Sequence, residues 1–215
     1  QPSRGLGDVY KRQVNNLVKP STGSVYLEGK NVTSAKKKEL KKIRSQIGMI
    51  FQTFNLVNRS TVLKNVLTGR LSNISTFRSI LGLWPKEQKQ MAFEALNQVE
   101  ILEKAYVRAS NLSGGQQQRV GIARALSQKP KVMLADEPVA SLDPITSRVV
   151  MSYLKKINTE LGITTIVNLH FLDLAKEFGD RLIGLRDGKL VFDGNVNDVS
   201  DEDFENIYGL SLIHI

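Results

Sequence analysis

The sequence contains no cysteine, which excludes disulfide bonds and thiolate metal sites. That absence is compatible with a reducing compartment and does not establish one. No uninterrupted apolar run approaches the roughly 20 residues that span a bilayer, so the sequence predicts no segment that crosses a membrane by itself. Internal repeats and low-complexity segments are also lacking.

The 215 residues have ordinary proportions for a globular protein, with 41% hydrophobic and 24% charged residues. The net charge of +9 would suit nucleic acid, an anionic lipid surface or nucleotide phosphates. Much of this charge comes from the lysines between Lys36 and Lys42. No aromatic residue interleaves with them to stack on bases, so a solvated helix face is the favoured interpretation. We therefore expect no nucleic-acid partner.

A serine and two adjacent glycines, Ser113–Gly115, open a segment whose apolar residues return at helical spacing. The pattern predicts a helix start that offers backbone N–H groups and the positive end of the helix dipole to an anion. Ser113 and Gln116 also have the S-x-x-Q spacing of a capping box, in which each side chain bonds the other's backbone amide. From this segment alone, an anion site and a purely local cap both remain open.

A second segment, Val132–Ala135, is a short apolar run that ends abruptly in Asp136 and Glu137. Such a run predicts a buried strand that delivers both carboxylates to the carboxyl edge of an α/β sheet, where ligands usually bind. Together with an anion site, the acid pair indicates binding of a nucleotide and a metal ion.

Downstream, a helix is predicted from Pro144 to Leu161, with Gly162 at its end, and the apolar segment Thr164–Leu169 then leads to His170. A strand–helix–strand crossover makes the two strands parallel, so His170 should emerge at the same edge as the acid pair. A lone histidine is more often structural, but the matched strand ends favour a place in the site.

These motifs occur together in one known family. Leu112–Gln116 resembles the signature motif of ABC-type ATPases, Val132–Glu137 their Walker B strand with its catalytic glutamate, and Ser141–Asp143 their D-loop. The similarity extends from about residue 14 to about residue 209 and is greatest to the ATPase subunits of phosphonate importers. The segments that carry this closer likeness are residues 57–70, 82–86, 136–144, 167–170 and 183–186.

The resemblance implies an α/β fold, the RecA-like P-loop NTPase core of ABC ATPases, made from residues 14–72 and 129–209. Residues 73–128 would form the helical (signature) subdomain, which includes an amphipathic helix from Lys86 to about Ile101. Residues 23–30 read as a strand of the remaining antiparallel β region, ending in a glycine turn. A hairpin with an Asp187–Gly188 turn and a final helix would close the fold.

The family's phosphate loop, G-x-x-x-x-G-K-[ST], should precede a segment like Val14–Pro20, but residues 5–12 hold glycines and a lysine in no such order. We therefore expect the fold to be incomplete at its N-terminus and the chain as printed to be inactive. Residues 1–13 and 210–215 are expected to be non-native tails, since they resemble translated cloning sequence.

By resemblance, ATP is held between two copies of the subunit. Ser113, Gly114, Gly115 and Gln116 would contact the nucleotide bound by the other copy, and Asp143 would connect the two sites.

The same resemblance assigns catalysis to the strand ends. Asp136 and Gln52 would hold Mg²⁺, Glu137 would act as general base towards water, and His170 and Gln52 would order the reacting groups. Gln52 is the residue that follows the short apolar strand Ile47–Phe51.

The partners implied are a second ATPase subunit, a permease that docks on the helical subdomain and Q-loop, and indirectly a substrate-binding protein outside the cell. The location implied is the cytoplasmic face of the membrane. Some large apolar groups of the helical subdomain should therefore be exposed. Two alternatives stay open: an ATPase-dead fragment that retains only permease docking, and a soluble ABC protein that acts on nucleic acid or ribosomes. The second is disfavoured because the chain has neither tandem cassettes nor long coiled-coil insertions.

Overall fold

The computed structural model describes residues 14–208. The expectations about residues 1–13 and 210–215, including the missing phosphate-loop order, lie outside the described residues. Within the described part of the chain, no helix is both long and apolar enough to span a membrane.

The strands are β1 (Tyr26–Leu27), β2 (Lys30–Asn31), β3 (Ile47–Ile50), β4 (Val132–Asp136), β5 (Thr164–Asn168), β6 (Arg181–Arg186) and β7 (Lys189–Asn195). The α-helices are α2 (Lys37–Arg44), α3 (Val62–Leu67), α4 (Thr76–Ile80), α5 (Lys86–Gln98), α6 (Gly114–Leu126), α7 (Pro144–Leu161), α8 (Leu172–Phe178) and α9 (Asp201–Tyr208). Short 3₁₀ turns are η1 (Thr68–Asn73), η2 (Leu102–Lys104), η3 (Ala109–Asn111) and η4 (Val196–Asp198).

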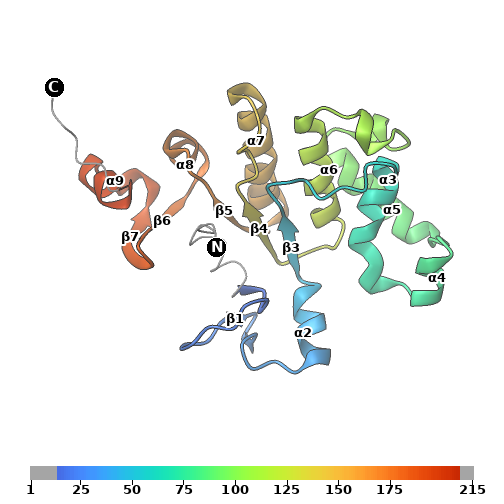
Figure 1. The fold of residues 1–215 in the computed structure, drawn as a ribbon, viewed down its shortest axis with the longest axis horizontal. Coiled ribbons are helices and arrows are strands. Elements are labelled where there is room, and N and C mark those ends of the chain that lie inside the picture. The colour runs from blue at the N-terminus through green and yellow to red at the C-terminus, as the bar shows by residue number, and fades with distance from the viewer. Residues whose placement is uncertain (1–13, 209–215) are drawn as a thin grey trace.

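A parallel sheet in the order β3-β4-β5 forms the middle of the molecule (Figure 1). Both neighbouring pairs are parallel, and the register places Ala135 of β4 beside Ile50 of β3 and Asp136 beside Asn168 of β5. The predicted parallel crossover from β4 through α7 to β5 is confirmed. Because all three strands run the same way, the residues that follow them meet at one edge.

The small β region near the start differs in detail from the predicted strand. β1 and β2 are two residues each and pair antiparallel. The turn between them, Glu28–Gly29, has both residues at positive φ, 49° and 72°, the left-handed geometry of a two-residue hairpin. The expected glycine turn and antiparallel strand are therefore confirmed, but the strand is shorter than residues 23–30 because the chain already reverses at Glu28.

The lysine-rich helix α2 confirms the solvated-face interpretation. Its lysines and Lys36 are exposed, while Ile43 is buried against Ile47 and Leu134. The helix therefore covers the end of the sheet with an apolar residue and turns its charges to water.

A group of helices, α3 to α6, lies at one end of the molecule (Figure 1). Here α3, α5 and α6 pack on one another and share a hydrophobic core with β3, β4 and α7. Helix α5 stops at Gln98, short of the expected Ile101, and Glu100 then reverses the chain at φ 53°. A left-handed residue cannot continue a right-handed helix, which accounts for the earlier end.

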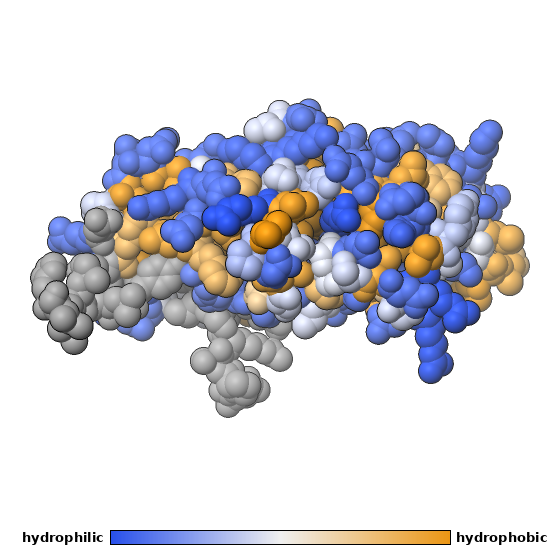
Figure 2. Space-filling model, turned by 90° about the horizontal axis from the view of Figure 1, so that it is seen from above, coloured by the Kyte–Doolittle hydropathy of each residue, from blue (hydrophilic) through white to orange (hydrophobic). Residues whose placement is uncertain are grey.

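The short helix α4 buries none of its own residues. Large apolar side chains on it and directly after it are exposed: Phe77, Ile80, Leu81 and Leu83. Figure 2 shows orange, hydrophobic atoms among blue ones at the end of the molecule where Figure 1 places α4. The expectation of exposed apolar groups in this region is confirmed.

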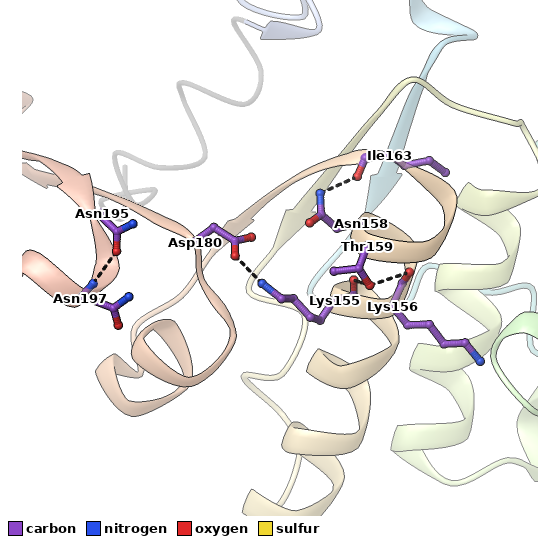
Figure 3. Close-up of polar contacts among 8 residues, drawn as sticks. All are labelled: Lys155, Lys156, Asn158, Thr159, Ile163, Asp180, Asn195 and Asn197. Carbon is purple, nitrogen blue, oxygen red and sulfur yellow. Dashed lines mark hydrogen bonds and ion pairs between the residues drawn. The ribbon is translucent and has the colours of Figure 1, made fainter.

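The far end of α7 is tied to the strands that follow it (Figure 3). Gly162 adopts φ 63° at the helix end, as predicted, and Asn158 donates to the Ile163 carbonyl at 3.1 Å. Lys155 Nζ lies 2.6 Å from Asp180 Oδ1, immediately before β6. The predicted hairpin follows as β6 and β7, with its turn at Asp187–Gly188.

Candidate active site at the carboxyl edge of the sheet

Each strand of the parallel sheet delivers a polar residue just beyond its carboxyl end. Gln52 lies two residues after β3, Glu137 directly follows β4, and His170 lies two residues after β5. The apolar strands fix these positions. Residues Met133–Ala135 of β4 are buried, and a shift of the strand along the sheet would expose them.

The Glu137 carboxylate lies between the other two side chains. Gln52 Nε2 donates to Glu137 Oε2 at 3.1 Å, and His170 Nε2 lies 2.6 Å from Glu137 Oε1. Three residues separated by up to 118 positions in the chain (170 − 52) thus form one cluster. Their predicted convergence is confirmed, and their roles in catalysis remain proposals.

The backbone of Glu137 is unusual. Its φ is 45°, in the left-handed region that non-glycine residues rarely occupy, and its N–H donates to the Asn168 carbonyl at 3.2 Å. The turn ends β4 and directs the carboxylate towards Gln52 and His170. The Glu137 side chain is 21% exposed and that of His170 61%, so the acid is sheltered while the imidazole faces solvent. Strain of this kind concentrates at functional sites.

Asp136 occupies the last position of β4, one residue before the cluster's glutamate. Asn168 Nδ2 lies 3.5 Å from its Oδ1, across the β4–β5 pair. No group of three or more His, Cys, Asp or Glu side chains converges as a metal site within residues 14–208. Mg²⁺ does not need one, because it is commonly bound by one or two carboxylates and several waters. The oxygen donors of Asp136 and Gln52 therefore fit this ion.

The Ser113 segment begins α6 as predicted. Ser113 Oγ accepts from the Gln116 amide at 3.3 Å, and Gln116 Oε1 accepts from the Ser113 amide at 3.0 Å. The capping box that the spacing allowed is therefore present. It leaves the anion-site interpretation open, because the amides of Gly114 and Gly115 still stand at the positive end of a 13-residue helix.

The two glycines also pack tightly. A Cβ on Gly115 would overlap Thr146 Cγ2, and one on Gly114 would lie 3.4 Å from Leu142 Cδ2. The start of α6 thus rests on the loop before α7 and on the first turn of that helix. Gly114 and Gly115 lie beside Leu142 and Thr146, whereas Gln52 and His170 both contact Glu137 at the sheet edge.

Asp143 caps α7. Its Oδ1 accepts from the amides of Ile145 at 3.1 Å and Thr146 at 2.9 Å. Hydrogen bonds from the Thr146 side chain and amide, together with the Ile145 amide, hold the pKa of Asp143 below its usual value of 3.8. This cap is a local structural function. The predicted contact of Asp143 between two nucleotide sites remains a proposal.

Two residues near the site were missed by the sequence reasoning. Asn168 pairs in register with Asp136 and bonds it, a position that only the strand pairing reveals. Arg124 donates to two backbone carbonyls, that of Asn55 at 2.6 Å and that of Phe54 at 2.9 Å, and burial lowers its pKa. A signal was present, since an arginine inside the apolar segment Ile122–Leu126 needs hydrogen-bond partners for its guanidinium.

A pocket of about 390 Å³ lies at the opposite, amino-terminal edge of the sheet. Its lining comes from α5, the ends of α6 and α7, and the segments that lead into β4 and β5. Gln52, Glu137 and His170 are not part of that lining. We place the candidate site at the carboxyl edge, because the polar side chains converge there.

Comparison with known proteins agrees with this geometry. The profile of the ABC transporter family matches residues 12–140. The phosphonates import ATP-binding protein PhnC 3 of Halalkalibacterium halodurans is 57% identical over 201 residues, 94% of this chain and 78% of the relative. The phosphonates import ATP-binding protein PhnC of Bacillus thuringiensis subsp. konkukian is 59% identical over 198 residues, 92% of this chain and 77% of the relative.

Solved structures share the fold. The ATP-binding cassette MJ0796, described as dimeric and bound to ADP and Pi, has a TM-score of 0.74 and 36% identity over 88% of this chain and 80% of its own. CbiO1 of Clostridium perfringens, part of an ABC transporter complex, has a TM-score of 0.81 and 28% identity over 98% of this chain and 81% of its own. On these findings the chain belongs to the ABC transporter family, as one of its ATPase cassettes.

Proposed function

We propose that the protein hydrolyses ATP as the nucleotide-binding subunit of an importer for phosphonate or a related phosphorus oxyanion. The observation that carries the proposal is the Glu137 carboxylate, held between Gln52 and His170 at the carboxyl edge of the sheet. The substrate class comes from relatives 57% and 59% identical that are named phosphonates import ATP-binding proteins. That part of the proposal rests on likeness, since an ATPase subunit does not itself contact the imported anion.

In the proposed reaction, Glu137 takes the proton of a water molecule that attacks the γ-phosphate. Its turn geometry and two hydrogen-bond partners fix the carboxylate, so little reorganisation is needed in the transition state. His170 lies 2.6 Å from the carboxylate and is 61% exposed, so its imidazole can turn towards a phosphate that arrives from solvent.

Mg²⁺ would neutralise charge on the β- and γ-phosphates when bound. Asp136 offers the carboxylate for it, and Asn168 orients that carboxylate from the neighbouring strand. Gln52 can supply its amide oxygen to the same ion, because the amide nitrogen is the atom that bonds Glu137.

A second copy of the chain completes each site in this proposal, and the structure of the similar cassette MJ0796 is described as dimeric. Ser113 and the amides of Gly114 and Gly115 would donate to the partner's γ-phosphate, supported by the positive end of α6. Gln116 holds the serine in place through the capping box. Asp143, next to the same loop, would carry contact between the two sites.

The test of the proposal is the Glu137→Gln variant of the protein expressed from its complete gene. The amide keeps the shape of the side chain but cannot accept the proton, so turnover of Mg-ATP should fall by roughly 10² to 10⁴-fold. Nucleotide binding should stay within about threefold of the unaltered protein, because the substitution leaves the binding groups intact.

Glu160→Gln is the matched control, since it makes the same chemical change at an exposed site near the end of α7. Its turnover should equal that of the unaltered protein. Full activity of Glu137→Gln, measured as phosphate release, would refute the proposed role of the carboxylate.

The partner proposal assigns permease docking to the α4 surface, defined by Phe77, Ile80, Leu81 and Leu83. Their exposed fractions lie between 53% and 78%, which is costly for a surface that stays in water. We place this surface in a helical subdomain of residues 73–128, with the ATPase core formed by residues 14–72 and 129–209. Docking there would hold the protein at the cytoplasmic face of the membrane, with the substrate-binding protein on the other side.

The paired substitution Phe77→Ser with Ile80→Ser tests this docking. It removes apolar area that only a partner would cover, so co-purification with the permease should be lost while ATP binding stays unchanged. Tyr26→Ser is the control, because Tyr26 is 64% exposed on β1 and lies outside the α4 surface. Undiminished association of the double variant would rule out the α4 surface as the contact.

A further inference from the structure

The segment after β3 runs to α3 without helix or strand structure, yet it carries Gln52 to the site. Its far end is fixed by Asn65 of α3, whose side chain accepts from the Val57 amide at 2.7 Å and donates to the Val57 carbonyl at 3.2 Å. Asn65 is 1% exposed, so this end is anchored in the core. The part between Gln52 and Val57 must be held by something else.

Arg124 of α6 holds that part. Its two terminal nitrogens donate separately to consecutive carbonyls, Nη1 to Asn55 at 2.6 Å and Nη2 to Phe54 at 2.9 Å. Burial lowers the pKa of this guanidinium. The guanidinium is partly buried and donates two charge-assisted hydrogen bonds to the segment, so it attaches the segment to α6.

Phe54 also lies along α6, within van der Waals reach of two of its glycines. A Cβ on Gly121 would lie 4.0 Å from the Phe54 carbonyl oxygen, and one on Gly114 3.8 Å from Cζ of its ring. The segment therefore touches α6 from the first turn, beside Ser113, to the turn that carries Arg124. A helix of 13 residues moves as a rigid rod over this distance.

We propose that Arg124 is a positioning residue of the ATPase site, which fixes residues 52–57 on α6 and so couples Gln52 to the Ser113–Gly115 loop. Displacing the segment shifts the start of α6, and displacing α6 shifts Gln52 against Glu137. The inference rests on the proposed function, because the position of Gln52 can affect turnover only if the site around Glu137 hydrolyses ATP.

The experiment compares Arg124→Gln and Arg124→Lys in the protein expressed from its complete gene. Glutamine cannot reach both carbonyls, so kcat for Mg-ATP should fall by about tenfold while KM changes by less than about twofold. Lysine keeps the charge but carries its donors on a single nitrogen, so the kcat of Arg124→Lys should lie between those of Arg124→Gln and the unaltered protein.

Arg119→Gln is the matched control. Arg119 lies on the same helix and also donates to two backbone carbonyls, those of Val99 at 3.4 Å and Glu100 at 3.1 Å. Its loss should lower the melting temperature much as the loss of Arg124 does, but leave kcat per folded molecule unchanged. An equal fall of kcat in the two glutamine variants would overturn the inference.

A double-mutant cycle with Gln52→Ala tests whether Arg124 acts through that glutamine. If it does, Arg124→Gln should lower kcat by less than about twofold once Gln52 is gone. A full, additive loss in the Gln52→Ala background would contradict the positioning role and leave the proposed function standing. The absence of ATP hydrolysis by the unaltered protein would instead refute the function itself, so the two failures are distinguishable.

Discussion

Asp143 combines a local structural function with a proposed contact between subunits. It caps α7 through the amides of Ile145 and Thr146, and these bonds favour its charged form. Because its pKa is lowered in the folded state, the charge stabilises the fold above the unfolded value of 3.8. The stabilisation is lost as the pH falls through the still lower pKa of the folded protein.

The Asp143→Asn variant isolates this effect. Thermal melts should show the unaltered protein more stable than the variant near neutral pH, and the gap should close as the pH falls below 3.8. The other carboxylates titrate in both proteins, so their effects cancel in the difference between the two melting temperatures. A gap that stays constant across that range would show that the charge contributes nothing to the cap.

Single residues were predictable where strand pattern and family resemblance agreed. Glu137 and His170 follow apolar runs whose ends a crossover must align, and their contact confirms the reasoning. Asn168 and Arg124 could not be placed the same way, because their partners are set by strand register and by a loop without regular structure. The left-handed backbone of Glu137 also has no signal in its residue type.

At the scale of elements, α6 and α7 approach closely where Gly115 faces Thr146. Gly115→Ala should destabilise the protein by about 1–3 kcal/mol, because the added methyl overlaps Thr146 Cγ2. Alanine in a helix ordinarily stabilises by about 0.5–1 kcal/mol over glycine, so the sign itself tests the packing.

Thr146→Ser offers the compensating change, since it deletes Cγ2 and keeps the hydroxyl. Combined with Gly115→Ala, it should restore most of the lost stability in urea unfolding. No recovery in the double variant, or a gain from Gly115→Ala alone, would contradict the close approach of the two helices.

Some helices and strands could be predicted from the sequence more accurately than others. The apolar runs of β4 and β5 and the Asp143-Pro144 start of α7 carry strong signals, and each was predicted within about a residue. The end of α5 and the reversal after β1 depend on left-handed Glu100 and Glu28. Glutamate rarely adopts a positive φ, so the residue type did not indicate a chain reversal at these two positions.

At the scale of the whole molecule, one parallel sheet gathers distant residues at one edge. The strand ends supply Gln52, Asp136, Glu137 and His170, and α6 presents Ser113–Gly115 beside α7. Parallel order follows from crossover rules, so this much of the architecture was predictable. Exposed apolar groups were expected in the helical subdomain, but only the structure shows which residues form the α4 surface.

Reconstitution in sealed vesicles tests the central claim most directly. The protein expressed from its complete gene, its permease and its substrate-binding protein would be assembled with Mg-ATP on the face that carries the ATPase. Uptake of a radiolabelled phosphonate should then proceed with ATP hydrolysis, and both should stop together in the Glu137→Gln variant. Phosphonate uptake that continues at the full rate with this variant would contradict the account.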